Sequence, residues 1–470
     1  MGIRKNKKAN LTEGSIGKEL IKLALPIMGT SFVQMTYNMM DMFWLGRVGS
    51  KAVAAVGTAG FFTWLAMAII MIPKIGAEVG VAQSMGKEDV GSARGFVNHT
   101  VQLDLILALI YGLFLIVFRK NLIGFFNLGD EEVISMAINY LVIIAPGIIF
   151  FFMNPVLTGI MNGYGNSRTP FIINSIGLLV NMVLDPILIF GLGPVPSLGV
   201  RGAALATITA QLVVTLVFGY VIKNVSDMSL FKGFVLFKIP DLIIIKKIFK
   251  LGIPVSLQNA IFAILSMFIA RIIANWGPIP IAVQKIGSQI ESISWMTASG
   301  FSTALGAFVG QNYGADKWGR IYKGYFKAIG LVSIIGVAAT CLLIFAAKPI
   351  FSMFIPESEA VRIGVDYLKI LGLSQWFMTI EITTAGAFNG LGRTTTPALI
   401  GIIFNGLRIP GALFLSSTLA LGLNGVWWSI SISSVFKGII LVSLFIFLLY
   451  RSPEVQNWRN QDKAVKKAGL

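Results

Sequence analysis

Apolar segments of membrane-spanning length recur along the whole chain and constrain its fold more than any other feature. They lie near residues 20–45, 53–83, 95–118, 135–160, 168–192, 201–222, 250–275, 281–310, 325–347, 363–388, 396–420 and 424–450. Crossing roughly 30 Å of hydrocarbon takes about 20 helical residues, so each segment predicts one transmembrane helix. We therefore expect an all-α integral membrane protein with twelve transmembrane helices.

The composition agrees with a chain that is solvated by lipid. Of 470 residues, 55% are hydrophobic and only 13% are charged, whereas soluble domains average about 25% charged residues. The single cysteine, Cys341, excludes a disulfide framework, and the single histidine, His99, argues against a multi-His metal site. Zinc and haem enzymes are therefore not expected.

The basic residues predict the orientation in the membrane. If the N-terminus is cytoplasmic, 25 of the 38 Lys and Arg residues fall on the inner side: in the head, the central stretch, the tail and the short loops between spans. Positively charged loops stay inside, so we expect both termini in the cytoplasm of a bacterial plasma-membrane protein. The first apolar run follows the uncleaved basic head, Arg4 to Lys8, rather than forming a signal peptide. A basic face against anionic lipid explains the net charge of +17 without a nucleic-acid partner.

The second half of the chain repeats the first. Four patterns return in order: Pro26 as Pro254, Gly86 as Gly314, Asn162 as Asn389, and Gly202 as Gly425, the first two at an offset of 228 residues. An offset of six spans preserves orientation, which predicts parallel repeats related by a pseudo-two-fold axis along the membrane normal. We expect an N-terminal six-helix lobe at 1–222, a cytoplasmic linker at 223–249, a C-terminal six-helix lobe at 250–450 and a cytoplasmic tail at 451–470.

Two six-helix lobes favour a carrier that works by alternating access. A channel would need a filter of carbonyls or charge rings, and no such repeat is visible. The glycine-rich loop from Asn162 is not followed by the Gly-Lys-Ser/Thr of a phosphate cradle. No metal motif or nucleophile with its base indicates an enzyme. Transport driven by an ion gradient is therefore expected.

Three polar residues from three spans are predicted to share one depth in the first lobe. Asp41 lies about six residues, or roughly 9 Å, from the outer end of its span, and Asp185 and Thr207 lie at similar depths in theirs. Asn181 precedes Asp185 by one helical turn. Carboxylates within a membrane usually face the bundle interior and bind ions, protons or substrate. A purely structural role for both aspartates, capping a kink near Pro186 or pairing with Asn181, is the alternative.

Desolvation and mutual repulsion oppose two negative charges in such a pocket. The pair is therefore predicted to hold a proton, or to bind sodium through carboxylate, amide and hydroxyl oxygens. In the sodium case Asp41, Asn181, Asp185 and Thr207 are the metal ligands. Neutralising the pair by either ion removes its attraction for a cationic drug.

Further residues are expected to line a substrate cavity. These are Gln34, Met35, Tyr37, Asn38, Asn154 and Glu291. Gln34 shares a helix face with Asp41, and flexible methionines suit ligands of many shapes, although lipid-facing packing explains them equally well. Other intramembrane charges favour structural roles: Lys74 is expected to pair with Glu78, and Glu381 with Arg408. His99 is expected to be structural, near the inner end of its span.

The chain resembles the multidrug and toxic compound extrusion family, the MATE transporters. The resemblance rests on Pro26, Asp41 followed by Trp44-Leu-Gly-Arg47, Gly80-Val-Ala-Gln83 with Gly86, Asn162-Gly163, and Asn181-Met-Val-Leu-Asp185-Pro186, and spans roughly residues 13–450. It is closest to the DinF-like and MepA-like bacterial branches, whose acidic residues lie in the N-terminal lobe, and the MepA-like resemblance makes Glu291 a candidate drug-facing carboxylate. The chain departs from the NorM-like pattern because span seven, 250–275, contains no carboxylate.

These features together predict a cation-coupled antiporter, using protons or sodium, that exports amphipathic and often cationic small molecules. Its expected partners are membrane lipid and small-molecule drugs, with no cofactor apart from sodium as a coupling ion, and a monomer is expected. The alternative is a flippase for a lipid-linked precursor. A pyrophosphate-lipid cargo would need several unpaired Arg or Lys residues, and the first lobe offers only Lys74.

Overall fold

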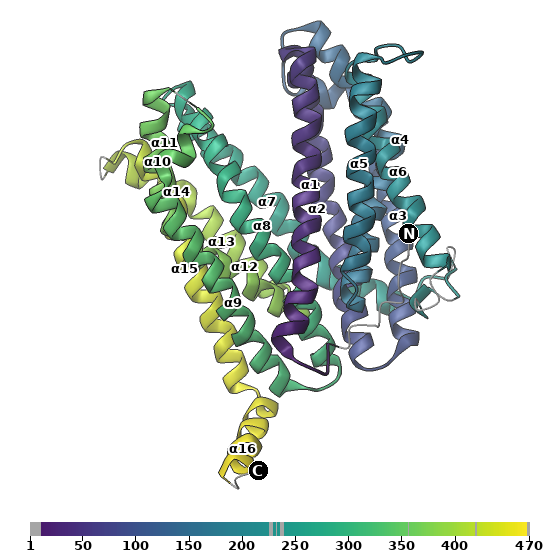
Figure 1. Cartoon of the computed structure of the whole chain (residues 1–470), viewed down its shortest axis with the longest axis vertical. Helices are drawn as coiled ribbons and strands as arrows, with labels where there is room; N and C mark the ends of the chain where they lie inside the picture. Colours follow the sequence, from purple (N-terminus) through teal and green to yellow (C-terminus); the bar gives the residue numbers. More distant parts are fainter. Residues whose placement is uncertain are drawn as a thin grey trace. The chain divides into compact units, whose positions relative to one another are not determined.

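The computed structural model describes residues 11–224, 229–231, 233–235, 239–355, 357–418 and 421–467. Within these residues the chain is helical and contains no strand (Figure 1). The basic head from Arg4 to Lys8 and parts of the predicted linker and tail lie outside the described residues. The all-α prediction is confirmed.

Six long helices form the first half of the chain. They are α1 (Ile16–Val48), α2 (Ser50–Gly86), α3 (Val90–Gly124), α4 (Glu131–Tyr164), α5 (Arg168–Phe190) and α6 (Val200–Asn224). Aspartates begin two of them: Asp89 accepts a hydrogen bond from the Ser92 N–H at 2.9 Å, and Asp130 accepts one from the Glu132 N–H at 2.9 Å. Such N-cap carboxylates satisfy backbone donors that a helix start leaves free.

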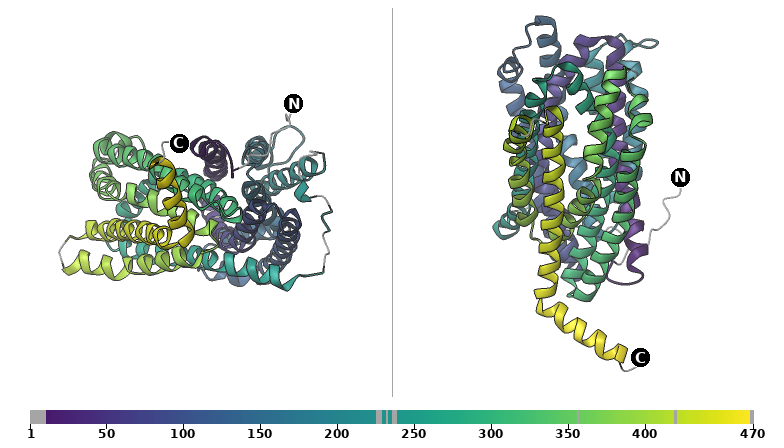
Figure 2. Two further views of the ribbon diagram at one scale, coloured as in Figure 1. Left: turned by 90° about the horizontal axis from the view of Figure 1, so that it is seen from below. Right: turned by 90° about the vertical axis from the view of Figure 1, so that its left-hand side faces the viewer.

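The second half repeats this order with more interruptions. After the short η1 (Ser229–Phe231) come α7 (Leu242–Ala274), α8 (Pro278–Gly314), α9 (Trp318–Phe345) and the short α10 (Ala347–Ser352). Span ten is divided into α11 (Ser358–Gly372) and α12 (Gln375–Gly390), and span eleven into α13 (Thr395–Gly406), α14 (Arg408–Leu413) and the π-helical η2 (Phe414–Thr418). α15 (Leu423–Arg451) is the last span, and α16 (Pro453–Lys467) continues from it after a bend (Figure 2).

Nine of the described helical segments are long and apolar enough to cross a membrane. The remaining predicted spans correspond to α1, α8 and the α11–α12 pair, which are of similar length but carry more polar residues or a break. The twelve predicted spans are therefore all helical. α7 begins at Leu242, earlier than the predicted start at 250, because Lys246 and Lys247 continue the helix rather than belonging to a linker.

One face of α3 shows what surrounds the molecule. Leu109, Ile110 and Leu113 are about 60% exposed, whereas Ala108 and Leu115 on the opposite face are fully buried. A continuous exposed apolar stripe on a helix would be unstable in water and is the normal surface of a helix in lipid. The chain is a multi-pass membrane protein.

The chain divides into two compact units whose boundaries fall inside helices. Leu25–Ser256 forms the first unit, and residues 11–24 join Leu257 and the following residues in the second. The predicted lobes instead met at the linker 223–249. The start of α1 therefore belongs with the second repeat, and the start of α7 with the first.

Hydrogen bonds hold the segment before α1 in the second unit. Arg320 donates to the carbonyls of Leu11, Glu13 and Gly14 at 3.2, 2.9 and 3.1 Å, and Lys317 donates to that of Thr12 at 3.0 Å. Four consecutive carbonyls are thus bound by two side chains near the start of α9.

The segment before α7 is held in the first unit in a similar way. The backbone N–H of Asp241 donates to Nε2 of His99 at 2.8 Å, and Nδ1 of His99 lies 2.7 Å from the Gly95 carbonyl. These partners assign a neutral imidazole with its proton on Nδ1. His99 is 2% exposed, so its structural role is the one expected from the sequence.

The same close packing of two helices occurs inside each of the two units. A methyl group at Gly163 would lie 2.4 Å from the Glu78 carbonyl oxygen, which brings α4 against α2. A methyl group at Gly390 would lie 2.4 Å from the Gly306 carbonyl oxygen, bringing α12 against α8 in the same manner. Small residues permit such backbone contacts between membrane helices.

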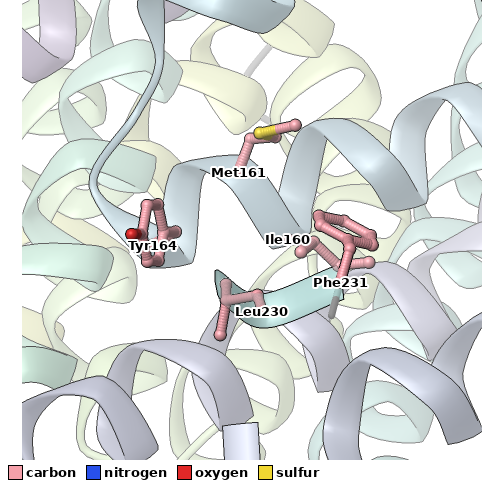
Figure 3. A pocket seen from close by; sticks show the side chains of 5 residues that line it. All are labelled: Ile160, Met161, Tyr164, Leu230 and Phe231. Atoms are coloured by element: carbon pink, nitrogen blue, oxygen red, sulfur yellow. The ribbon is translucent and has the colours of Figure 1, made fainter. Parts of the chain in front are cut away.

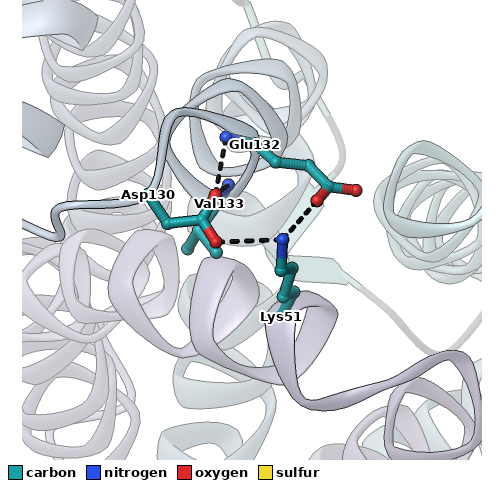
Figure 4. A network of polar contacts seen from close by, with 4 residues as sticks. All are labelled: Lys51, Asp130, Glu132 and Val133. Atoms are coloured by element: carbon teal, nitrogen blue, oxygen red, sulfur yellow. Dashed lines mark hydrogen bonds and ion pairs between the residues drawn. The ribbon is translucent and has the colours of Figure 1, made fainter.

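A surface ion cluster joins α2 to α4 at the end of the first unit where both helices begin (Figure 4). Nζ of Lys51 lies 3.0 Å from Asp130 and 2.5 Å from Glu132. The hydrogen bond from Lys51 holds the pKa of Asp130 below its usual value. Asp130 therefore caps α4 and pairs with Lys51 at once.

Candidate functional site

Two aspartates converge inside the first unit. Asp41 is half-buried on α1 and Asp185 is fully buried on α5, yet their carboxyl groups lie within hydrogen-bonding reach of each other. A hydrogen bond between two carboxyl groups requires a proton on one of them. The residues predicted from depth alone thus occupy one site.

Neutral donors satisfy only part of this pair. Nδ2 of Asn181 donates to Oδ1 of Asp185 at 3.1 Å, and Oγ1 of Thr207 lies 3.5 Å from Oδ2 of Asp41. Within the described residues, Asp41 Oδ1, Asp185 Oδ2 and Asn181 Oδ1 are buried without any donor. Three oxygens of one site therefore remain available to a proton or a cation.

No Lys or Arg forms an ion pair with either aspartate in the part of the chain that the structure describes. Two carboxylates this close and this dry cannot both stay charged without a counter-ion, because desolvation and repulsion add. The arrangement can take up a proton, which the two acids would share, or bind a small cation through its oxygens.

Aromatic and amide groups enclose the pair. The Tyr37 hydroxyl donates to the Thr207 carbonyl at 3.2 Å, and its side chain also hydrogen-bonds to Gln211 of α6. Tyr140 of α4 is buried close to both carboxyl groups. Tyr140 and Gln211 were not among the residues predicted from the sequence. Tyr140 lies nine residues into α4, at about the depth of Asp41, so the depth count used for Asp41 also indicates Tyr140.

Asn154 links α4 to α6 by several hydrogen bonds. Nδ2 donates to Oε1 of Gln211 at 2.7 Å and to its carbonyl at 3.0 Å, while Thr215 donates to Oδ1 of Asn154 at 2.8 Å. This side chain is 2% exposed. The structure therefore places Asn154 as a crosslink one hydrogen-bonded step beyond Tyr37.

The other predicted cavity residues on α1 lie outside the acid pair. Gln34 and Met35 are half-buried and Asn38 is exposed. Neither Gln34 nor Asn38 hydrogen-bonds to Asp41 or Asp185 in the described structure. Asn38 lies three residues before Asp41 on α1, but its side chain is exposed whereas that of Asp41 is half-buried.

Glu291, predicted to face substrate, is bound by neutral groups of the second unit. The Tyr367 hydroxyl donates to Oε1 at 2.5 Å and Nε2 of Gln375 donates to Oε2 at 3.0 Å. Ser294 donates to Oε1 of Gln375 at 2.5 Å, which fixes the amide orientation. The Trp427 ring packs edge-on against Tyr367 with centroids 5.1 Å apart. Both carboxylate oxygens of Glu291 thus have a donor.

Glu381 and Arg408 do not form the predicted ion pair among the described residues, although they lie close enough to interact electrostatically. Glu381 pairs with Lys437 of α15 at 3.2 Å, and both side chains are about 10% exposed. Nε of Arg408 instead donates to Ser433 at 2.6 Å, and a terminal nitrogen of Arg408 donates to Ser434 at 3.1 Å. Sequence spacing gives the depth of each charge in its span but not the direction in which it points.

The predicted pair of Lys74 and Glu78 is also not formed as an ion pair among the described residues. Glu78 is buried, with Lys74 close enough to interact with it electrostatically. The backbone of α2 at both residues packs on Gly159 and Gly163 of α4.

Two further observations bear on ligands. A small pocket between the end of α4 and η1 is lined by apolar residues and by Tyr164 (Figure 3): Ile160, Met161, Tyr164, Leu230 and Phe231. It holds none of the acidic residues. No group of three or more His, Cys, Asp or Glu residues forms a metal cluster in the described ranges.

Comparison with known proteins decides the family. The MatE family model matches residues 26–187 and again residues 254–414. The chain belongs to the MatE family. The two matches begin 228 residues apart, at Pro26 and Pro254, which is the offset of the internal repeat.

Relatives and solved structures agree with this assignment. A probable multidrug resistance protein NorM of Thermotoga maritima is 30% identical over 433 residues, covering 92% of each chain. A FAD transporter of Shewanella oneidensis is 24% identical and covers 91% of this chain and 94% of that protein. A solved outward-facing multidrug resistance MATE transporter of the MOP superfamily, 25% identical, superposes with a TM-score of 0.86 and covers 96% of this chain and all of that one.

This MatE protein is therefore a membrane transporter and not an enzyme, with the twelve-helix, two-lobed architecture of its family. Its relatives above include a NorM protein. The assignment to the DinF-like and MepA-like branches stays a prediction.

Proposed function

We propose that this transporter exports amphipathic, often cationic, small molecules in exchange for a coupling cation. The observation that carries the proposal is the pair Asp41 and Asp185, which meet without a basic partner and keep one buried oxygen each without a donor. Asn181 and Thr207 complete the proposed ion-coupling site. The relatives named as multidrug resistance proteins support the class of substrate.

Charge balance links ion and drug at this site. With the coupling cation absent, the carboxyl pair carries negative charge and favours a cationic drug nearby. When a proton or sodium ion binds, that charge is neutralised and the drug loses its electrostatic attraction. Ion entry down its gradient thus drives drug release, and the two ligands compete for one site.

The residues fit a sodium ion as coupling ion as well as a proton. Sodium would be held by Asp41, Asp185, the Asn181 side-chain oxygen and the Thr207 hydroxyl, of which the first three each keep a buried oxygen without a donor. A proton needs no particular ligand geometry and is our preferred coupling ion.

Alternating access is the proposed mode of transport. The repeated halves, matched separately by the family model, are the usual construction of carriers that expose a single site to either side in turn. We further propose that both termini are cytoplasmic, that a monomer embedded in membrane lipid transports, and that the membrane is a bacterial plasma membrane, as in the bacterial relatives.

The flippase alternative needs free buried cations to bind a pyrophosphate. In the second unit Lys437 is paired with Glu381 and Arg408 is bound by two serines. Lys74 in the first unit lies close to Glu78. A cationic cargo therefore agrees better with these charges. Because one of the relatives is named a FAD transporter, an anionic nucleotide is the competing cargo to test against a cationic drug.

The test is efflux by purified protein in liposomes, with a pH gradient and a sodium gradient imposed separately. A fluorescent lipophilic cation and FAD serve as the two cargoes. We expect gradient-driven movement of the cation and none of FAD. Movement of FAD alone, or movement of the cation with neither gradient, would contradict the proposal.

A further inference from the structure

Asp104, in the middle of α3, is a buried acid without a role in the proposed coupling site. Its exposure is 0%, and neither carboxylate oxygen has a hydrogen-bond donor among the described residues. No ion pair reaches it in the same part of the chain. A charged carboxylate in such surroundings is among the most unfavourable groups in a membrane protein.

The contacts of α3 place Asp104 along its neighbour α2. The Tyr111 hydroxyl donates to the Phe62 carbonyl at 2.6 Å, and Gly80 packs on the Phe96 ring. Because the two helices run antiparallel, these contacts put Asp104 level with the turn of α2 around Ile70.

Ionisable groups are few on the elements packed against this level. Along α2 they are Lys74 and Glu78, one and two turns further on, and along α4 there is none between Tyr140 and Tyr164. The described η1 residues contain none. The start of α7 packs on Gly95 of α3 and Gly76 of α2. Its ionisable groups, Asp241, Lys246, Lys247 and Lys250, are all exposed, and none forms an ion pair with Asp104 among the described residues. On α3 itself, Arg94 lies three turns away, and His99 and Tyr111 have hydrogen-bond partners elsewhere. None of them supplies a counter-charge bound to Asp104.

A proline supplies a suitable acceptor at the same level. Pro73 lies inside α2 and has no N–H, so the carbonyl of Ile69 lacks its helical donor. A neutral carboxyl group carries an O–H donor, whereas a carboxylate has only acceptors. Protonation of Asp104 thus removes the buried charge. It also provides an O–H donor at the level of the Ile69 carbonyl, which lacks its helical donor.

We propose that Asp104 is a second proton-binding site of the first unit, occupied in this structure and emptied once in each transport cycle. On release the O–H bond breaks, the proton passes to water that reaches α3 when the helices rearrange, and the carboxylate is hydrated. The site is separate from the coupling pair, since Asp104 stands on α3 and the pair on α1 and α5. Only the emptying step rests on the proposed transport function.

Infrared spectroscopy of the full chain in liposomes at pH 7 tests occupancy. The spectrum of the wild type minus that of Asp104→Asn should contain the carbonyl band of a protonated carboxyl group. The band should persist in an Asp41→Asn, Asp185→Asn double variant, which separates it from the coupling pair. Absence of the band would overturn the proposal. If Asp104→Asn does not fold, Asp104→Glu replaces it, and a shifted band is then expected.

Deuterium exchange tests the emptying step. In heavy water at rest the band should shift slowly, because Asp104 has no exposed surface. During turnover of a lipophilic cation under an imposed gradient, the shift should become at least about tenfold faster, as expected for a site opened by the cycle. Equal rates would overturn the proposal. Failure of transport itself would leave the resting band in place and so would be recognised separately.

Discussion

The acids of the two units are neutralised in different ways. In the first unit Asp41 and Asp185 meet with no basic partner among the described residues, and oxygens of both remain without donors. In the second unit Glu381 is paired with Lys437 at 3.2 Å, and Glu291 has a donor on each oxygen. The first unit keeps buried oxygens that could bind a mobile cation, whereas in the second unit the cation next to Glu381 is a lysine side chain.

This difference indicates how a repeated scaffold can divide its tasks. The packing of α2 on α4 returns as that of α8 on α12, down to the contact glycines. The charges do not repeat: the positions equivalent to Lys74 and Glu78 by the 228-residue offset are Ser302 and Gly306. Packing therefore keeps the symmetry of the repeat, whereas the buried charges differ between the two units, in agreement with the proposal that ion coupling takes place in the first unit.

Removing either acid of the first unit should have the largest effect. Asp41→Asn or Asp185→Asn takes away the charge that the coupling cation neutralises, and gradient-driven efflux should fall to the level of empty liposomes. The variants should still fold, because asparagine keeps the size and hydrogen-bonding capacity of aspartate. Glu381→Gln combined with Lys437→Met is the matched control and should retain efflux.

A lysine introduced next to Asp41 should reproduce in the first unit the fixed positive charge that Lys437 supplies to Glu381 in the second. Thr207→Lys brings an ammonium group next to Asp41, whose Oδ2 lies 3.5 Å from the present hydroxyl. Efflux should be lost, and drug binding should no longer depend on pH or sodium. Thr207→Val, which removes the hydroxyl without adding charge, should retain part of the activity; equal loss in both variants would contradict the charge argument.

Removing the attached cation of the second unit should reduce stability. Lys437→Met leaves Glu381 buried without its partner, a defect that costs about 3–5 kcal/mol. The double variant Lys437→Met, Glu381→Gln should recover most of that loss. Thermal unfolding in detergent measures both, and a double variant as unstable as the single one would show that the pair is not the reason.

A smaller loss is expected at Glu291. Tyr367→Phe removes one of its two donors and should lower stability by about 1–3 kcal/mol, the usual range for leaving a buried acceptor unsatisfied. Gradient-driven efflux should persist if coupling resides in the first unit. Abolished efflux in a folded Tyr367→Phe protein would place a coupling group in the second unit as well.

The surface cluster should have the smallest effect, and one that depends on pH. Lys51 holds the pKa of Asp130 below its usual value, so their interaction stabilises the folded state above the unfolded pKa of aspartate and is lost as the pH falls through the lower, folded pKa. Asp130→Asn should therefore lower the melting temperature slightly at pH 7. The difference from wild type should vanish in acid; a constant difference would assign it to helix capping alone.

The depth of each polar residue within its membrane span could be predicted from the sequence. Counting residues from the end of each span brought Asp41, Asp185 and Thr207 to one level, since every helical residue advances the same distance along the axis. The direction in which a side chain points around the helix axis could not be predicted for spans that are apolar on all sides, because such spans have no polar face to orient them. For this reason Lys437, inside an apolar span, was not recognised as the partner of Glu381.

The fold, like the site, could be predicted in part from the sequence. Twelve spans and two repeats are visible as runs of apolar residues and recurring patterns. The exchange of the segments before α1 and α7 is not, because it depends on hydrogen bonds such as those from Arg320 to the carbonyls of Leu11 and Glu13. Every residue has a backbone carbonyl, so the sequence does not indicate which carbonyls a side chain binds, and contacts of this kind are visible only in the structure.

Drug binding itself offers the most direct measurement of the central claim, that Asp41 and Asp185 together hold one exchangeable cation. Calorimetric titration of the purified protein with a lipophilic cation, in buffers of different ionisation enthalpy and at several sodium concentrations, reports which ion the drug displaces. We predict release of about one proton or one sodium ion per drug bound, and none from the Asp41→Asn, Asp185→Asn variant. A drug affinity that is indifferent to both pH and sodium in the wild type would contradict the account.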